Sequence, residues 1–156
     1  MIETPREIGM FLKEEYITSR LTYRGSMFSD EDLARPMVGI ADSFTETTPG
    51  HTNLRLVSQY CKYGVYRGGG TPVEFGTIAP CDGVAQGHCG MHYILPSRDN
   101  IADGVELMTQ AHRLDAIILV GSCDKIVPGM LSHNYLLLPW CHCCHPQGVS
   151  PLNCLS

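Results

Sequence analysis

The chain has 156 residues, of which 44% are hydrophobic and 17% are charged, a composition that excludes a disordered or collagen-like chain. Its 11 Lys and Arg residues against 16 Asp and Glu give a net charge of -5 with no basic stripe, so we expect no nucleic-acid partner. No apolar run reaches the roughly 18 residues that cross a membrane. The start MIETPREIGMFLKEE has acidic residues on both sides of a short apolar patch instead of the basic start and apolar run of a signal peptide, so we expect no membrane partner and a cytoplasmic location.

The first half of the chain predicts helix, strand and helix. Apolar residues at roughly helical spacing predict a helix over residues 5–24, and the acidic residues after Ser29 predict a short helical turn. The apolar run at 37–41 predicts a strand. The next helix ends at the glycines 68–70, and its apolar residues recur at spacings of three and four, namely Leu54, Val57, Cys61 and Val65.

The same pattern then recurs. We expect a strand over residues 73–79, a long glycine-rich loop, and a helix over 101–112 that Ser97 caps. Residues 116–120 are apolar at every position, which is typical of a strand buried on both faces of a parallel sheet. The alternation predicts an α/β fold in which a parallel sheet is flanked by helices.

Three segments rich in polar residues, glycine and metal-binding residue types follow the three predicted strands. They cover residues 42–51, 80–96 and 121–130. In parallel sheets, functional groups gather beyond the carboxyl ends of the strands. The sequence therefore predicts a site where these three segments meet.

The third of these segments places Cys123, Asp124 and Lys125 in consecutive positions. A thiolate suits iron in a cluster, a carboxylate suits Mg²⁺, and a lysine beside a divalent cation could be carbamylated into a further oxygen ligand. The alternative is that the cysteine is a packing residue, the aspartate caps the following helix, and the lysine is a surface charge.

The other two segments carry further candidate ligands. Asp82 follows Cys81 and could bind the same Mg²⁺ as Asp124, or it could simply close a turn. His51 stands among hydroxyl residues near a predicted helix start, where backbone N–H groups can hold an anion, although capping or packing is the alternative role.

Several motifs in order resemble one family. They are PVEFGTIAPCDGVAQGHCGMHYILPSRDNIAD (residues 72–103), VELMTQAHRLDA (105–116) and GSCDKIVPGML (121–131). The chain resembles the dihydroxy-acid dehydratase and phosphogluconate dehydratase family over about residues 20–131, and is most similar to dihydroxy-acid dehydratases. The resemblance implies that the chain is the N-terminal part of a larger two-domain dehydratase.

The resemblance also implies a site with an iron–sulfur cluster and Mg²⁺. Cys123 corresponds to a cluster cysteine, Asp82 and Asp124 to Mg²⁺ ligands, and Lys125 to a lysine that ligates Mg²⁺ as a carbamate. Many relatives have another cluster cysteine where this chain has Gly50, so both 2Fe-2S and 4Fe-4S clusters stay open. Cys81 could contribute a further ligand.

The family reaction is the loss of water from a 2,3-dihydroxy carboxylic acid to give a 2-keto acid, as in branched-chain amino acid biosynthesis. The resemblance implies a small dihydroxy acid as substrate, a homo-oligomeric full-length protein, and a serine base in a C-terminal domain, so that no catalytic residue is assigned here. The alternatives are a dehydratase of gluconate-type sugar acids or their phosphates, and a catalytically silent or interaction protein.

Composition changes abruptly after Leu131. Residues 132–156 contain no Asp, Glu, Lys or Arg but hold half of the eight cysteines. We therefore expect residues 1–131 to form a partial N-terminal dehydratase domain and residues 132–156 to be an aberrant tail from a frameshift or a mispredicted gene end, with a zinc-binding tail as the alternative. On this interpretation no strand follows Leu131, the sheet keeps an apolar edge, and the chain alone is inactive.

Overall fold

The computed structural model describes residues 7–137, 141–145 and 148–149. Its sheet has the order β2-β1-β3-β4-β5, with parallel pairing from β2 to β4 and antiparallel pairing of the last strand. The strands are β1 (Met37–Asp42), β2 (Thr71–Gly76), β3 (Ala116–Val120), β4 (Cys141–His145) and β5 (Gly148–Val149). The predicted parallel sheet flanked by helices is confirmed.

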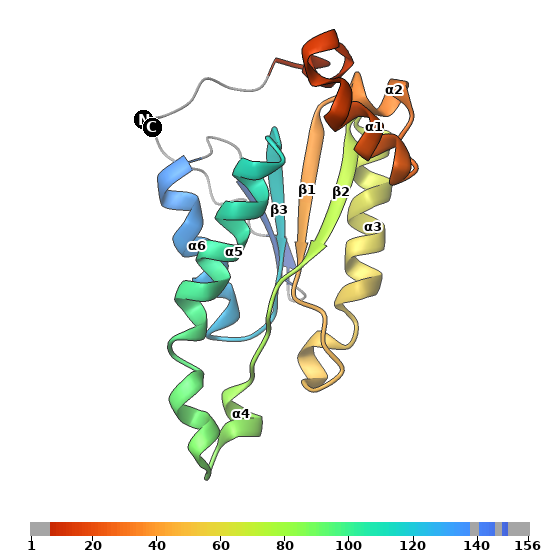
Figure 1. The fold of residues 1–156 in the computed structure, drawn as a ribbon. Helices are drawn as coiled ribbons and strands as arrows, with labels where there is room; N and C mark the ends of the chain where they lie inside the picture. Colours follow the sequence, from red (N-terminus) through yellow and green to blue (C-terminus); the bar gives the residue numbers. More distant parts are fainter. Residues whose placement is uncertain (1–6, 138–140, 146–147, 150–156) are drawn as a thin grey trace.

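Helices cover both faces of the sheet (Figure 1). One face carries α3 (Leu54–Arg67), and the other carries α5 (Ser97–Ala111) and α6 (Ile126–Leu137), which pack on each other. The chain passes from β1 through α3 to β2 on one side, then through α5 to β3 on the other side of β1. This doubly wound path leaves a switch point between β1 and β3, where such sheets bind ligands.

Two apolar cores follow from the alternation of side chains along the strands. Ile117 and Leu119 point into the larger core under α5 and α6, which Ile101 and Val105 complete. On the opposite face, β1, β3 and α3 form a smaller core from Ile40, Val120 and Leu54. Burying each such side chain stabilises the fold by about 1.5–3 kcal/mol.

The amino-terminal segment lies at the amino ends of the strands (Figure 1). The helix predicted over 5–24 is interrupted: η1 (Met10–Leu12) and η2 (Glu14–Tyr16) are 3-10 turns, and α1 (Ile17–Gly25) starts only after them. Lys13 between the two turns has extended backbone, which an α-helix does not permit. The predicted turn after Ser29 is α2 (Asp30–Leu33), and Ser29 and Asp32 form its capping box.

Other differences from the predicted elements are local. Ser97 does not cap α5; its hydroxyl donates to the carbonyl of Ile94 at 2.6 Å, and the helix already begins at Ser97. The loop after β2 contains the short helix α4 (Asp82–Ala85) and the 3-10 turn η4 (Cys89–Tyr93), and the loop after β1 contains η3 (Pro49–His51). Elements this short show no hydrophobic period, so the pattern did not predict them.

The expected bare edge after β3 is not found. β4 pairs with β3 in parallel, with Ile117 opposite Cys141 and Val120 opposite Cys144. Unpaired backbone groups along an edge strand offer hydrogen bonds to any extended segment that can reach them. In addition, α6 continues past Leu131, the expected boundary, to Leu137.

Candidate metal centre

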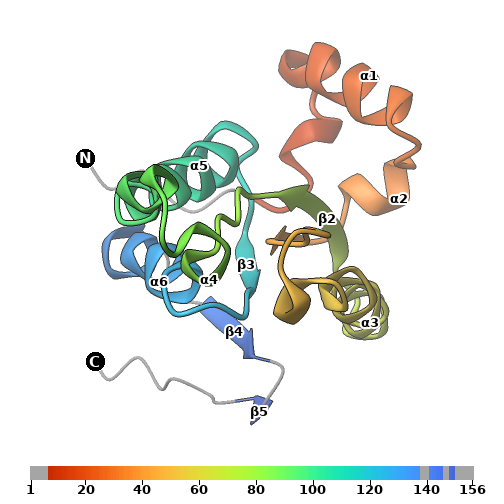
Figure 2. The ribbon, with the colours of Figure 1, turned by 90° about the horizontal axis from the view of Figure 1, so that it is seen from below.

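The segments after β1, β2 and β3 lie at the same edge of the sheet, the lower one in Figure 1, which Figure 2 shows from below. Figure 1 shows α4 beyond the carboxyl ends of the strands, on the side of the sheet that carries α5 and α6. The predicted meeting of the three segments can therefore be followed residue by residue.

Cys81, Asp82 and Cys123 form a tight group. One ligand atom from each residue lies within 4.8 Å of the other two, and all three side chains are partly buried. Cys81 and Asp82 stand at the start of α4, where the N–H of Gly83 donates to Asp82 Oδ1 at 2.9 Å. Cys123 comes from the loop between β3 and α6. The group thus joins the ends of two strands that β1 separates in the sheet.

Lys125 brings Asp124 to the same place. Its ammonium donates to Asp124 Oδ2 at 2.5 Å and to Asp82 Oδ2 at 3.5 Å. Because both oxygens contact the same Lys125 Nζ, Asp124 Oδ2 and Asp82 Oδ2 lie no farther apart than the sum of the two distances, 2.5 Å and 3.5 Å. An ammonium ion therefore lies between two carboxylates that come from different loops.

These contacts set the charges of the side chains at the site. The hydrogen bond from Lys125 holds the pKa of the Asp124 carboxyl below its ordinary value, and the same bond raises the pKa of the Lys125 ammonium. Burial raises the pKa of the Cys123 thiol. At neutral pH the site therefore holds a carboxylate, an ammonium and a neutral thiol, and a metal would have to displace the thiol proton.

The loop after β1 is tied to the end of β3 through Ser43, and His51 contacts Ser43. The Ser43 hydroxyl donates to the carbonyl of Val120 at 2.8 Å, and His51 Nδ1 donates to the carbonyl of Ser43 at 2.6 Å. His51 Nε2 is buried and has no hydrogen-bond partner within the described ranges.

Gly50 brings this loop against the residue before Cys123. A Cβ placed at Gly50 would lie 3.1 Å from Ser122 Oγ, so the glycine permits a close approach of the two loops. Sequence reasoning did not single out Ser43 or Ser122, and their positions directly after β1 and β3 were the available signal.

The donor atoms suit a metal centre. Two thiols match a thiophilic metal such as iron or zinc, and two carboxylates match a hard cation such as Mg²⁺. Among the described cysteines, Cys61 packs on the α3 side of the sheet, and Cys89 is exposed on η4 outside this group. The arrangement can hold a metal ion, and all five residues selected from the sequence contribute to it or contact it.

These features define an α/β domain in which candidate metal-binding side chains stand beyond the carboxyl ends of its strands. Residues 35–136 match the family described as "Dihydroxy-acid/6-phosphogluconate dehydratase N-terminal". The chain belongs to this family, which confirms the resemblance seen in its motifs.

The chain is also similar to several dihydroxy-acid dehydratases. That of Ignicoccus hospitalis is 54% identical over 122 residues, which are 78% of this chain and 22% of the relative. That of Methanococcus maripaludis is 53% identical over 113 residues, 72% of this chain and 20% of the relative. That of Desulfitobacterium hafniense is 54% identical over 103 residues, 66% of this chain and 18% of the relative. The chain thus spans about a fifth of each relative's length, and its fold is that of the N-terminal part of a larger dehydratase.

Proposed function

We propose that the chain forms the metal-binding part of a hydro-lyase that dehydrates a 2,3-dihydroxy carboxylic acid to a 2-keto acid. The observation that carries this proposal is the meeting of Cys81, Asp82 and Cys123 within 4.8 Å at the ends of β2 and β3. The identity above 50% to proteins named dihydroxy-acid dehydratase supports the same reaction. The setting that we propose for it is branched-chain amino acid biosynthesis.

Each site residue has a defined task in this proposal. Cys123 holds an iron–sulfur cluster, and Asp82 and Asp124 hold Mg²⁺. The Lys125 ammonium loses one proton, and the free amine then attacks CO₂ and loses a second proton to give a carbamate anion. This oxygen ligand replaces the ammonium between the two carboxylates by a negative group. When bound, the cluster and Mg²⁺ would supply Lewis acids for the departing hydroxyl and the enolate oxygen.

The remaining assignments concern the working environment. Within the described residues, no helix has the length and apolar character needed to cross a membrane. We place the protein in the cytoplasm, acting on a small dihydroxy acid without a nucleic-acid or membrane partner and as a homo-oligomer when full-length. The working residues belong to 1–131, and residues 132–156 contribute none of the proposed ligands.

Binding of Mn²⁺, a spectroscopic substitute for Mg²⁺, tests the hard-cation site. The full chain is titrated with Mn²⁺ in bicarbonate buffer, and bound ion is followed by electron paramagnetic resonance. Asp82→Asn and Asp124→Asn should each weaken binding at least about tenfold, a loss of about 1.4 kcal/mol. Asp103→Asn, at an exposed position on α5, is the matched control and should bind like the wild type.

The same samples test the substrate. Bound Mn²⁺ should broaden the nuclear magnetic resonance lines of 2,3-dihydroxyisovalerate more than those of 6-phosphogluconate, and Asp124→Asn should abolish the difference. Binding of Mn²⁺ that ignores both Asp82 and Asp124, or broadening that is equal with and without the protein, would reject the proposed function.

A further inference from the structure

The two thiols of the metal centre stand at a separation that suits one metal atom. Cys81 Sγ and Cys123 Sγ lie within 4.8 Å of each other. Two thiolates bound tetrahedrally to one ion, each at about 2.3 Å, are about 3.8 Å apart. Thiolates bound to two different irons point away from each other. The distance between their sulfurs then exceeds the length of two metal–sulfur bonds, which is about 4.6 Å. The upper bound of 4.8 Å on the present pair allows the first arrangement.

The pair also has a third donor. A carboxylate oxygen of Asp82 lies within the same 4.8 Å of both sulfurs. Two sulfurs and one oxygen favour a thiophilic divalent ion and leave one tetrahedral position for an external ligand, as catalytic sites require. All three side chains are partly buried, which limits their motion and still leaves them accessible to an incoming ion.

We propose that Cys81 and Cys123 bind the same metal atom and clamp it between the end of β2 and the end of β3, with one carboxylate oxygen of Asp82 as the third donor and the other oxygen left for the hard cation. The metal is a single thiophilic divalent ion or one iron of a cluster. The cluster form rests on the proposed function, whereas the clamp for a single ion does not.

Cobalt(II) is the probe for the clamp itself, because thiolate ligation gives it strong charge-transfer absorption and tetrahedral geometry gives intense visible bands. Each anaerobic titration is made on the full chain and repeated with Cys141, Cys143, Cys144 and Cys154 replaced by Ser, which removes thiols outside the group. Cys81→Ser and Cys123→Ser should each remove about half of the charge-transfer absorbance that the clamp contributes. Cys89→Ser, which changes an exposed thiol outside the group, should remove none.

Iron and sulfide reconstitution is the second measurement. Cys81→Ser and Cys123→Ser should both reduce bound iron and alter the visible spectrum, and Cys89→Ser should do neither. Circular dichroism and the thermal midpoint of each variant separate lost ligation from lost folding. A third variant, Cys81→Asp, keeps a metal donor at this position and should restore Co²⁺ binding without the sulfur absorption of Cys81.

The outcomes separate the two proposals. If folded Cys81→Ser keeps the full cobalt spectrum and the full iron content while Cys123→Ser loses both, the clamp is wrong and the cluster assignment of Cys123 stands. If both variants lose cobalt absorbance but the wild-type chain takes up no iron and sulfide, the clamp stands and the cluster of the proposed function falls. Cobalt absorbance that is equal in all folded variants overturns the clamp.

Discussion

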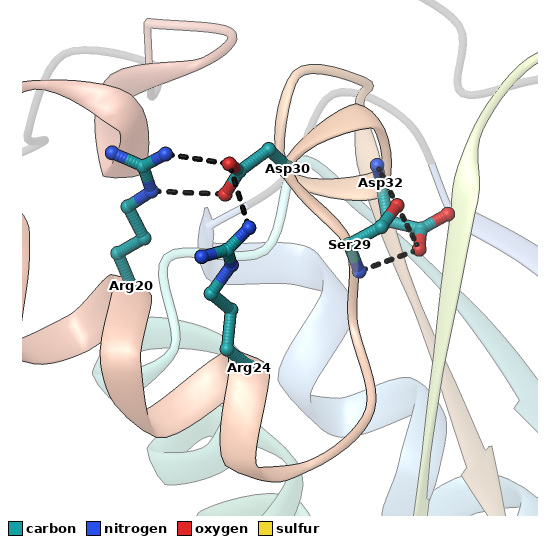
Figure 3. A network of polar contacts seen from close by, with 5 residues as sticks. All are labelled: Arg20, Arg24, Ser29, Asp30 and Asp32. Atoms are coloured by element: carbon teal, nitrogen blue, oxygen red, sulfur yellow. Dashed lines mark hydrogen bonds and ion pairs between the residues drawn. The ribbon is translucent and has the colours of Figure 1, made fainter.

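Asp30 joins the first two helices at the amino ends of the strands (Figure 3). It accepts two hydrogen bonds from Arg20, at 2.9 and 2.5 Å, and one from Arg24, at 3.0 Å. A bidentate arginine–carboxylate pair fixes geometry as well as charge. The hydrogen bonds from Arg20 hold the pKa of the Asp30 carboxyl below its ordinary value, and the charges of both arginines act in the same direction. The folded chain therefore favours the ionised carboxylate.

Asp30→Asn should show this in the pH dependence of stability. A carboxyl whose pKa falls on folding stabilises the folded state above its unfolded pKa of about 3.9, and this contribution is lost as the pH falls through the lower folded pKa. We expect the variant to unfold at lower urea concentration than the wild type at about pH 7, with a difference that shrinks below about pH 4. Urea unfolding at several pH values measures it.

The control removes the same charge elsewhere. Asp103→Asn changes an exposed carboxylate on α5 and reports the effect of net charge alone. A wild-type advantage over Asp30→Asn that stayed constant through the acid range would show that the Asp30 charge does not stabilise the fold.

The identity of the site residues could be predicted from the sequence, but their contacts could not. Cys81, Asp82, Cys123, Asp124 and Lys125 became candidates because each follows a predicted strand and has the chemistry of a metal site. Their roles came from the resemblance to the dehydratase family. The contacts among these side chains could not be predicted from the sequence. Lys125 contacts the carboxylates of two loops, and His51 donates to Ser43. Both contacts depend on loop conformations, which the hydrophobic periodicity of the sequence does not predict.

Gly129 decides how closely α6 packs on α5. A Cβ at this position would lie 3.1 Å from the carbonyl oxygen of Arg98, 3.2 Å from its Cα and 3.2 Å from Cβ of Ile101. Two of these atoms belong to the backbone of Arg98, which cannot relieve a close contact by changing rotamer. The glycine is therefore required by the contact between the two helices.

Gly129→Ala and Gly104→Ala should change stability in opposite directions. In a helix interior, alanine raises the free energy of unfolding by about 1 kcal/mol relative to glycine. At Gly129, however, the added methyl group must displace the neighbouring helix, which should lower the free energy of unfolding by about 1–3 kcal/mol. At Gly104, in α5, an added methyl group would meet no heavy atom within 4 Å among the described residues, so the full gain should appear there. Urea unfolding of both variants checks this, and stabilisation by Gly129→Ala would contradict the packing argument.

Helices and strands with a clear period were predicted well, and those without one were not. α3 and β3 were expected because Leu54, Val57 and Cys61 mark one helix face and residues 116–120 are apolar throughout. β2 starts before the predicted run and ends sooner, since strand bounds depend on pairing with β1 rather than on its own apolar residues. α4, which carries Asp82, is too short to have a period.

The whole molecule is organised around the switch point between β1 and β3. β2 and β3 lie on opposite sides of β1, and yet the loops that follow them meet, because Cys81 and Asp82 at the start of α4 lie close to Cys123 after β3. The metal donors therefore belong to segments about forty residues apart in sequence, as the contact from Lys125 to Asp82 shows. Unfolding separates them completely.

A metal bound at this centre should consequently stabilise the entire fold. Mn²⁺ is the better probe here than a thiophilic ion, because cysteines of an unfolded chain also bind thiophilic ions and reduce the effect. At about 100 times its dissociation constant, an ion that binds only the folded chain adds about 2.7 kcal/mol, which corresponds to about 5–10 °C in the thermal midpoint of a chain of this size. Differential scanning calorimetry with Mn²⁺, followed by chelator, measures the gain and its reversal. At the same Mn²⁺ concentration, Asp82→Asn and Asp124→Asn should each lose at least about half of the gain, since each removes a carboxylate from the same ion, whereas Asp103→Asn should keep it. A gain of equal size in all three variants would mean that Mn²⁺ binds away from the ends of β2 and β3.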